Sequence, residues 1–141
     1  MEKSRKLTLI GTGMFLISFL LPSYMGGNGF NCAWMCASII LNDFSLGSAY
    51  YFAFSFSNLL MLTLPFLILV HYRERPTPRF LIGLQILSLL HVLSWLLLNL
   101  GDLGSIKIGY YFWLGSMALL LRATWMRCET QSEARARLLC S

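Results

Sequence analysis

The segment "FLIGLQILSLLHVLSWLLLNL", residues 80–100, decides the fold. It contains no Asp, Glu, Lys or Arg, and a helix needs about 20 apolar residues to cross the hydrocarbon core of a bilayer. The stretches 7–42, 44–70 and 108–121 are free of charged residues as well. This pattern predicts an all-α, polytopic membrane protein.

The composition supports this prediction. Of the 141 residues, 57% are hydrophobic and only 12% are charged, and the mean hydropathy of +0.65 exceeds that of soluble domains. We place four spans, near 7–25, 48–72, 80–100 and 106–126. The segment near 29–42 is apolar but too short to cross, so we expect an outer interfacial helix there. Residues 1–141 are thus expected to form a single integral membrane domain, a four-helix bundle.

The basic residues predict the orientation of the spans. The net charge of +5 would suggest nucleic acid in a soluble protein, but here the cations flank the spans and predict no nucleic-acid partner. They precede the first span, separate the second from the third and follow the fourth: Lys3, Arg5, Lys6, Arg73, Arg75, Arg79, Arg122, Arg127, Arg135 and Arg137. We therefore expect a multi-pass inner (plasma) membrane protein with both termini in the cytoplasm. The first helix is expected to be retained, because no small-residue cleavage site follows Pro22.

Small residues predict where helices approach one another. Gly11 and Gly13 leave flat patches on the first span. Ala49, Ala53 and Ser57 recur every four residues on the second and share one face. Because helices associate in lipid by close packing, we predict these five as helix-contact residues.

Amphipathic side chains predict the two membrane boundaries, and the lipid bilayer is an expected partner. The residues predicted to lie at the lipid interface are Trp34, Tyr110, Tyr111 and Trp113 on the outer side and Trp125, Arg122 and Arg127 on the inner side.

A polar stripe runs along the predicted third span. At 100° per residue, five side chains fall within about 120° of arc: Gln85, Ser88, His91, Trp95 and Asn99. His91 has three open interpretations: a neutral imidazole hydrogen-bonded to Ser88, Gln85 or a neighbouring helix; a proton relay or quinone contact; or a haem ligand. His71 lies at a different membrane depth, which disfavours a haem held by two histidines, and we predict no cofactor.

Cys32 and Cys36 form a second candidate site. On a helix their Cβ atoms lie about 5–6 Å apart, whereas a disulfide needs about 3.5–4.5 Å. Four interpretations are open: packing thiols, a structural disulfide, a redox pair, or a copper(I) site completed by Met25 or Met35. No outer histidine joins the pair, so we predict no metal site.

The chain resembles two groups of four-span membrane proteins. It is similar to the quinone-linked membrane disulfide oxidases in length and in one outer cysteine pair. Here, however, the spacing is C-x-x-x-C and the 101–105 loop has no cysteine, so their activity is not carried over. It resembles more closely a family of uncharacterised small four-span bacterial inner-membrane proteins, through Gly29, Phe30 and Cys32, "YYFAFSFSN" at 50–58, and Gly109 to Ser116. That resemblance implies the fold and the membrane but no activity.

The function predicted from these observations is non-catalytic. The sequence shows no nucleophile paired with a base, no complete metal shell and no phosphate cradle, so we predict no enzyme. We expect an accessory or assembly subunit that packs against a larger membrane protein complex, or a homo-oligomer. The alternative is a small carrier or a thiol- or quinone-linked redox protein that uses the stripe around His91 and the outer cysteines.

Overall fold

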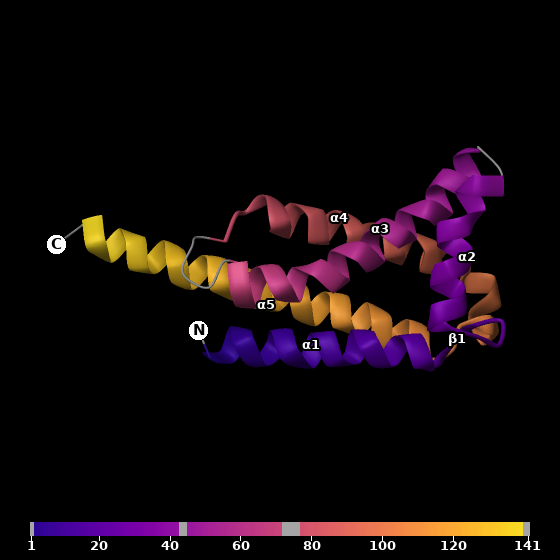
Figure 1. The fold of residues 1–141 in the computed structure, drawn as a ribbon, viewed down its shortest axis with the longest axis horizontal. Coiled ribbons are helices and arrows are strands. Elements are labelled where there is room, and N and C mark those ends of the chain that lie inside the picture. Colours follow the sequence, from indigo (N-terminus) through magenta and orange to yellow (C-terminus); the bar gives the residue numbers. More distant parts are fainter. Residues whose placement is uncertain (1, 43–44, 72–76, 140–141) are drawn as a thin grey trace.

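The computed structural model describes residues 2–42, 45–71 and 77–139, and these are mostly helical (Figure 1). The long helices are α1 (Glu2–Leu20), α3 (Leu46–Phe66), α4 (Phe80–Leu98) and α5 (Ile108–Leu139). The shorter elements are β1 (Pro22–Tyr24), β2 (Gly27–Asn28), α2 (Gly29–Asn42), the π-helical turn η1 (Leu67–His71) and the 3₁₀ helix η2 (Leu100–Ser105). Asp43, Arg73, Arg75 and Cys140, and the side chains of His71, Arg135 and Arg137, lie outside this description.

The long helices alternate in direction along the bundle (Figure 1). α1 and α5 lie side by side, and α3 and α4 lie over them. The strands, α2 and η2 gather at one end of the bundle, while α1 begins and α5 ends toward the other. Ser4 on α1 donates a hydrogen bond to the carbonyl of Ala123 on α5 at 2.9 Å, which fastens these two helices at the latter end.

Local sequence explains where α3 begins and ends. Ser45 caps its N-terminus, because the Ser45 hydroxyl accepts a hydrogen bond from the Ser48 amide at 3.2 Å. Pro65 has no amide hydrogen to give to the ladder, and the regular helix ends one residue later, at Phe66. The chain continues as the π-helical turn η1, so the helix widens directly after Pro65.

A β-hairpin follows α1, and it corrects the predicted first span, which was placed as far as residue 25. β1 and β2 are antiparallel and are joined by Met25 (φ 47°) and Gly26 (φ 80°). Positive φ at both positions is the geometry of a two-residue type I′ turn. The helix therefore ends at Leu20, and residues 22–28 form the hairpin.

Two glycines allow the hairpin to pack tightly. A Cβ at Gly29 would collide with the carbonyl oxygen of Ser18 and lie 2.8 Å from the Cα of Phe19, at the end of α1. A Cβ at Gly109 would lie 2.5 Å from Ser23 Oγ and 2.8 Å from the carbonyl oxygen of Pro22. Because Gly29 has no side chain, the start of α2 can approach the end of α1. Because Gly109 has none, the start of α5 can approach the hairpin.

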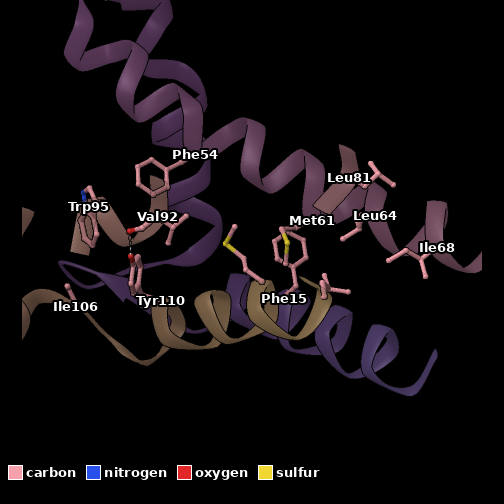
Figure 2. Packing of buried hydrophobic residues seen from close by; sticks show 12 residues of the cluster. Phe15, Phe54, Met61, Leu64, Ile68, Leu81, Val92, Trp95, Ile106 and Tyr110 are labelled. Carbon is pink, nitrogen blue, oxygen red and sulfur yellow. Dashed lines mark hydrogen bonds between the residues drawn. The ribbon is translucent and has the colours of Figure 1, made fainter. Parts of the chain in front are cut away.

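The core lies where α1, α3, α4 and α5 meet (Figure 2). Its side chains include Phe15, Met61, Leu64, Ile68, Leu81, Val92, Trp95, Tyr110 and Leu120. Tyr110 donates its hydroxyl hydrogen to the carbonyl of Val92 at 2.8 Å, which satisfies the polar atom of a ring that is 6% exposed (Figure 2). Phe54, Trp95 and Tyr110 lie toward the hairpin end together with Val92 and Ile106. The other end holds Phe15 and the aliphatic side chains Met61, Leu64, Leu81 and Ile68.

Two helices of the described chain are long and apolar enough to cross a membrane. They are Leu46–Val70, with mean hydropathy 2.0, and Phe80–Leu98, with mean hydropathy 2.1. In the most apolar 18 residues of each helix, only 39% and 28% are buried, respectively. Most of both helices therefore faces the surroundings of the chain. α1 carries Glu2, Lys3, Arg5 and Lys6 in its first turns, and α5 contains tyrosines, tryptophans and arginines. The four-span arrangement therefore stays a prediction.

Replacing Gly29 or Gly109 by alanine should destabilise the protein, because the new methyl group meets backbone that cannot move aside. We expect a loss of about 2–3 kcal/mol in the free energy of unfolding, measured by thermal unfolding of the purified protein in detergent. Gly83→Ala is the matched control, because a Cβ on Gly83 in α4 meets no described atom within 4 Å. It should be neutral or slightly stabilising. Equal melting temperatures for all three variants would contradict the close approach.

Candidate functional site

A pocket of about 420 Å³ lies between α2, the hairpin and the adjoining ends of the long helices. Its lining residues come from α1, the hairpin, α2, α3, the end of α4 and α5. The apolar and aromatic lining residues are Phe19, Tyr24, Met25, Cys32, Ala33, Met35, Cys36, Ile39, Tyr51, Phe54, Trp95, Tyr110 and Trp113. None of the described lining residues is charged. The pocket is thus suited to an uncharged molecule.

Aromatic rings in edge-to-face and tilted contact form one wall of the pocket. The ring of Trp95 lies 5.2 Å from Tyr24 on the hairpin and 5.2 Å from Tyr110 on α5, measured between centroids. Trp113 continues the series, 5.9 Å from Tyr110 and 5.8 Å from Phe54 on α3. Offset and edge-to-face contacts of this kind hold rings in fixed positions. The wall therefore has a defined shape built from four separate elements.

The polar groups of the pocket fall into two sets. Asn99 donates through Nδ2 to the carbonyl of Trp95 at 2.8 Å, and the hydroxyl of Tyr110 is bound to Val92. By contrast, the indole Nε1 of Trp113 is buried and has no partner among the described residues. The half-buried amide of Asn58 on α3 makes no hydrogen bond within that part of the chain either. The Trp113 indole and the Asn58 amide thus have hydrogen-bonding capacity that the described chain does not use.

His91 lies beside this pocket, between two aromatic rings of α3. Its centroid is 4.6 Å from that of Tyr50 and 4.6 Å from that of Phe54. The imidazole Nε2 is buried without a partner in the described structure. The hydrogen bond predicted from Gln85 is not formed, because Gln85 donates instead to Thr124 Oγ1 on α5 at 3.0 Å. On its α3 side His91 is held by these ring contacts and by a hydrogen bond with the backbone of Tyr50.

The rest of the predicted stripe does not make a single site. Gln85, Ser88 and Trp95 are buried, and His91 and Asn99 are half-buried, so all five face the bundle to some degree. Gln85 pairs with Thr124 far from the hairpin, whereas Trp95 and Asn99 line the pocket. The stripe thus serves helix packing at one end and the pocket at the other.

Cys32 and Cys36 face the pocket as free thiols in the part of the chain that the structure describes. α2 is helical from Gly29 to Asn42, which is the arrangement that separates i and i+4 thiols too widely for a disulfide. Burial raises the pKa of Cys32, and burial together with the neighbouring Cys32 raises the pKa of Cys36 to about 11. Both thiols are therefore protonated and weakly nucleophilic at neutral pH. No group of three His, Cys, Asp or Glu in the described ranges is placed to hold a metal.

The predicted helix-contact residues differ in their surroundings. Gly11 is buried, and a Cβ there would lie 3.0 Å from Leu120 Cγ on α5. A Cβ on Gly13 would meet no described atom within 4 Å. On α3 the exposure rises along the predicted face: Ser57 is buried, Ala53 half-buried and Ala49 exposed.

Two residues predicted at the lipid interface are buried, and a third is partly so. Tyr110 belongs to the core, and Arg127 is only 7% exposed, beside Ser4 at the start of α1. Trp113 is half-buried in the aromatic wall. These expectations rested on depth along the helix, which does not determine the face on which a side chain lies. Trp34, Tyr111, Arg122 and Trp125 are exposed.

The sequence reasoning missed Asn58, the unpaired amide of the pocket. A usable signal was present, because Asn58 is a polar side chain within the charge-free stretch 44–70, and polar groups inside a span mark functional sites. It also missed Tyr24 and Phe54 as parts of a site. Tyr24 belongs to the hairpin, whose strands of three and two residues are too short to give a strand pattern in the sequence.

Comparison of the chain with protein-family models, curated proteins and solved structures finds no match. The function is therefore inferred from the chain's own residues.

Replacing His91 by leucine should change the melting temperature little, because leucine fills a similar volume and removes the unpartnered Nε2, which offsets the loss of the imidazole's hydrogen bond with the backbone of Tyr50. Gln85→Leu is the matched comparison. It breaks the bond to Thr124, and we expect it to lower the free energy of unfolding by about 1–2 kcal/mol. A large loss of stability in His91→Leu would show that the imidazole makes a structural hydrogen bond.

Cys36 should react slowly with iodoacetamide, and its rate should still be rising at pH 10. A pKa of about 11 in place of the ordinary 9.0 lowers the thiolate fraction at neutral pH about a hundredfold. The rate at Cys36 is measured against pH by peptide mass spectrometry in the unchanged chain, so that Cys32 stays beside it, with N-acetylcysteine as the reference thiol. A rate that levels off below pH 9 would contradict the burial of this thiol.

Proposed function

We propose that the chain is a four-span integral membrane protein that acts as a non-catalytic accessory or assembly subunit of a larger membrane complex. On this proposal both termini lie in the cytoplasm, and α2 lies at the outer surface of a bacterial inner membrane. Membership of the small four-span bacterial proteins that the sequence resembles is part of the same proposal.

The exposed apolar surface supports a membrane setting. Large apolar side chains project outward along α1, α3 and α4, and soluble monomers rarely expose continuous patches on this scale. They include Leu9, Ile10, Leu16, Ile17, Leu20, Phe52, Phe56, Leu59, Leu62, Phe66, Val70, Phe80, Leu87, Leu90, Leu97 and Leu98. A bilayer would cover all of these faces at once.

The setting of Gly13 carries the proposal of a protein partner. Gly13 lies on α1 among the exposed side chains of Leu9, Leu16 and Leu20, which follow helical spacing. Beside Gly11, two residues earlier, the space that a side chain would occupy is taken by Leu120 of α5. No described atom lies within 4 Å of the position of a Cβ on Gly13. The result is a small notch in an apolar helix face that the chain itself does not use. Such notches let a second helix approach closely in lipid.

The small residues at the start of α3 point the same way. Ala49 is exposed and Ala53 only half-buried, so this face is incompletely covered by the chain's own helices. A Cβ on the nearby Gly47 would meet, among the described atoms, only Ser45 Oγ at 3.7 Å, which is ordinary contact. A partner helix could therefore reach α3 as well as α1.

A small carrier is the alternative function, and the uncharged pocket under α2 favours it. Its redox form is less well supported, because electron exchange through thiols needs a thiolate, and the pKa values of Cys32 and Cys36 are raised.

The proposal is tested by isolating the chain from its own membrane with a tag on the C-terminus, in a mild detergent or in native nanodiscs. We expect a stoichiometric membrane protein partner or a defined homo-oligomer. Gly13→Leu should reduce that association about tenfold, since filling the notch removes about 1–2 kcal/mol of helix packing.

Gly83→Leu provides the matched control. Gly83 is an exposed glycine on α4, and a Cβ there likewise meets no described atom within 4 Å. This variant should associate like the unchanged chain. A monomer that co-isolates with nothing, or an equal loss in both variants, would contradict the proposal.

A further inference from the structure

We propose that the pocket under α2 binds an uncharged, lipid-soluble ligand built on a flat ring that bears a carbonyl group. This inference goes beyond the accessory role and does not depend on a protein partner.

The size and charge of the pocket define the class of ligand. Its volume of about 420 Å³ lies within the range of about 300–1,000 Å³ typical of small-molecule sites. No described lining residue carries a charge that would hold a phosphate or a carboxylate. Cationic side chains border instead a separate hollow at the opposite end of α1, where Lys3 and Arg127 lie. A charged lipid headgroup is therefore a poor fit to the pocket under α2.

The aromatic wall favours a ring over an acyl chain. Phe54, Trp95, Tyr110 and Trp113 belong to three different helices, and Tyr24 adds a ring from the hairpin. Figure 2 shows Phe54, Trp95 and Tyr110 gathered at the same end of the core. The ring contacts hold these side chains in fixed positions, so flat surfaces are already presented when a ligand arrives. A flat ligand can stack or meet them edge-on without rearranging them.

The unused hydrogen-bonding groups define what the ring must carry. The indole nitrogen of Trp113 can only donate, and it is buried without a partner among the described atoms. The amide of Asn58 can also donate, and it lines the pocket from α3. A ligand carbonyl can accept a hydrogen bond from the half-buried amide of Asn58, whereas the buried nitrogen of Trp113 can be reached only if its side chain shifts. Asn99 and Tyr110 already donate to backbone carbonyls, so the recognition is tested at Asn58.

The test uses the full chain in nanodiscs of zwitterionic phospholipid, titrated with a short-chain alkyl 1,4-naphthoquinone. A quinone quenches tryptophan fluorescence on contact, and Trp95 and Trp113 both line the pocket. Trp34 and Trp125 do not line it, so both are replaced by phenylalanine to remove their background. We expect quenching that saturates at a low mole fraction of quinone in the lipid.

Asn58→Leu should shift the saturation midpoint about tenfold to higher quinone, which is the effect of one lost hydrogen bond in an apolar site. Thr63→Val is the matched control, because Thr63 is an exposed polar residue on the same helix whose hydroxyl bonds its own backbone. The melting temperatures of both variants serve as the check that they are folded.

Two results would overturn the proposal. Quenching that rises linearly, or that saturates equally in Asn58→Leu and the parent, would mean that the quinone only partitions into the lipid. A phospholipid that co-purifies with the chain by mass spectrometry, and that the quinone fails to displace, would mean that the pocket holds an acyl chain instead.

Discussion

Backbone hydrogen bonds at the hairpin end are the constraint on which the rest of the structure depends, because an unpaired N–H or C=O is costly in apolar surroundings. The amide of Gly29 donates to the carbonyl of Leu21 at 3.1 Å, and the amide of Lys107 donates to the carbonyl of Ser23 at 2.8 Å. These bonds join the end of α1 to the starts of α2 and α5. They place the hairpin, and with it Tyr24, against the rings of α4 and α5. The pocket exists because these ends are fixed to one another.

The helical part of the fold was predictable, since runs without charge leave a chain in lipid few choices other than helix. α4 was placed within two residues of its observed end at Leu98, and α2 within one residue at either boundary. The hairpin was not predictable in the same way. Its turn uses Met25, which is uncommon at positive φ, in place of the asparagine or aspartate typical of type I′ turns. The first helix was therefore extended across the hairpin.

The site was predicted only in part. The sequence singled out both cysteines and the stripe around His91, and the cysteines, Trp95 and Asn99 all line the pocket. Helical periodicity does not show which face of a helix its neighbours will cover. Tyr110 and Arg127 were expected at the lipid interface but are buried, because partners across α4 and α1 cover them. Asn58 was overlooked because its meaning depends on the elements opposite it.

The length of α5 has a mechanical consequence. Its 32 residues extend about 48 Å at 1.5 Å per residue, against about 30 Å for a hydrocarbon core. The helix starts at the pocket and extends beyond the N-terminus of α1 (Figure 1). Its sequence contains no glycine or proline after Gly115. α5 therefore has no residue after Gly115 at which a helix commonly bends, and this part tilts as one rigid segment. A 10° tilt at the pocket would sweep its far end sideways by about 8 Å, so a slight change at one surface becomes a large displacement at the other.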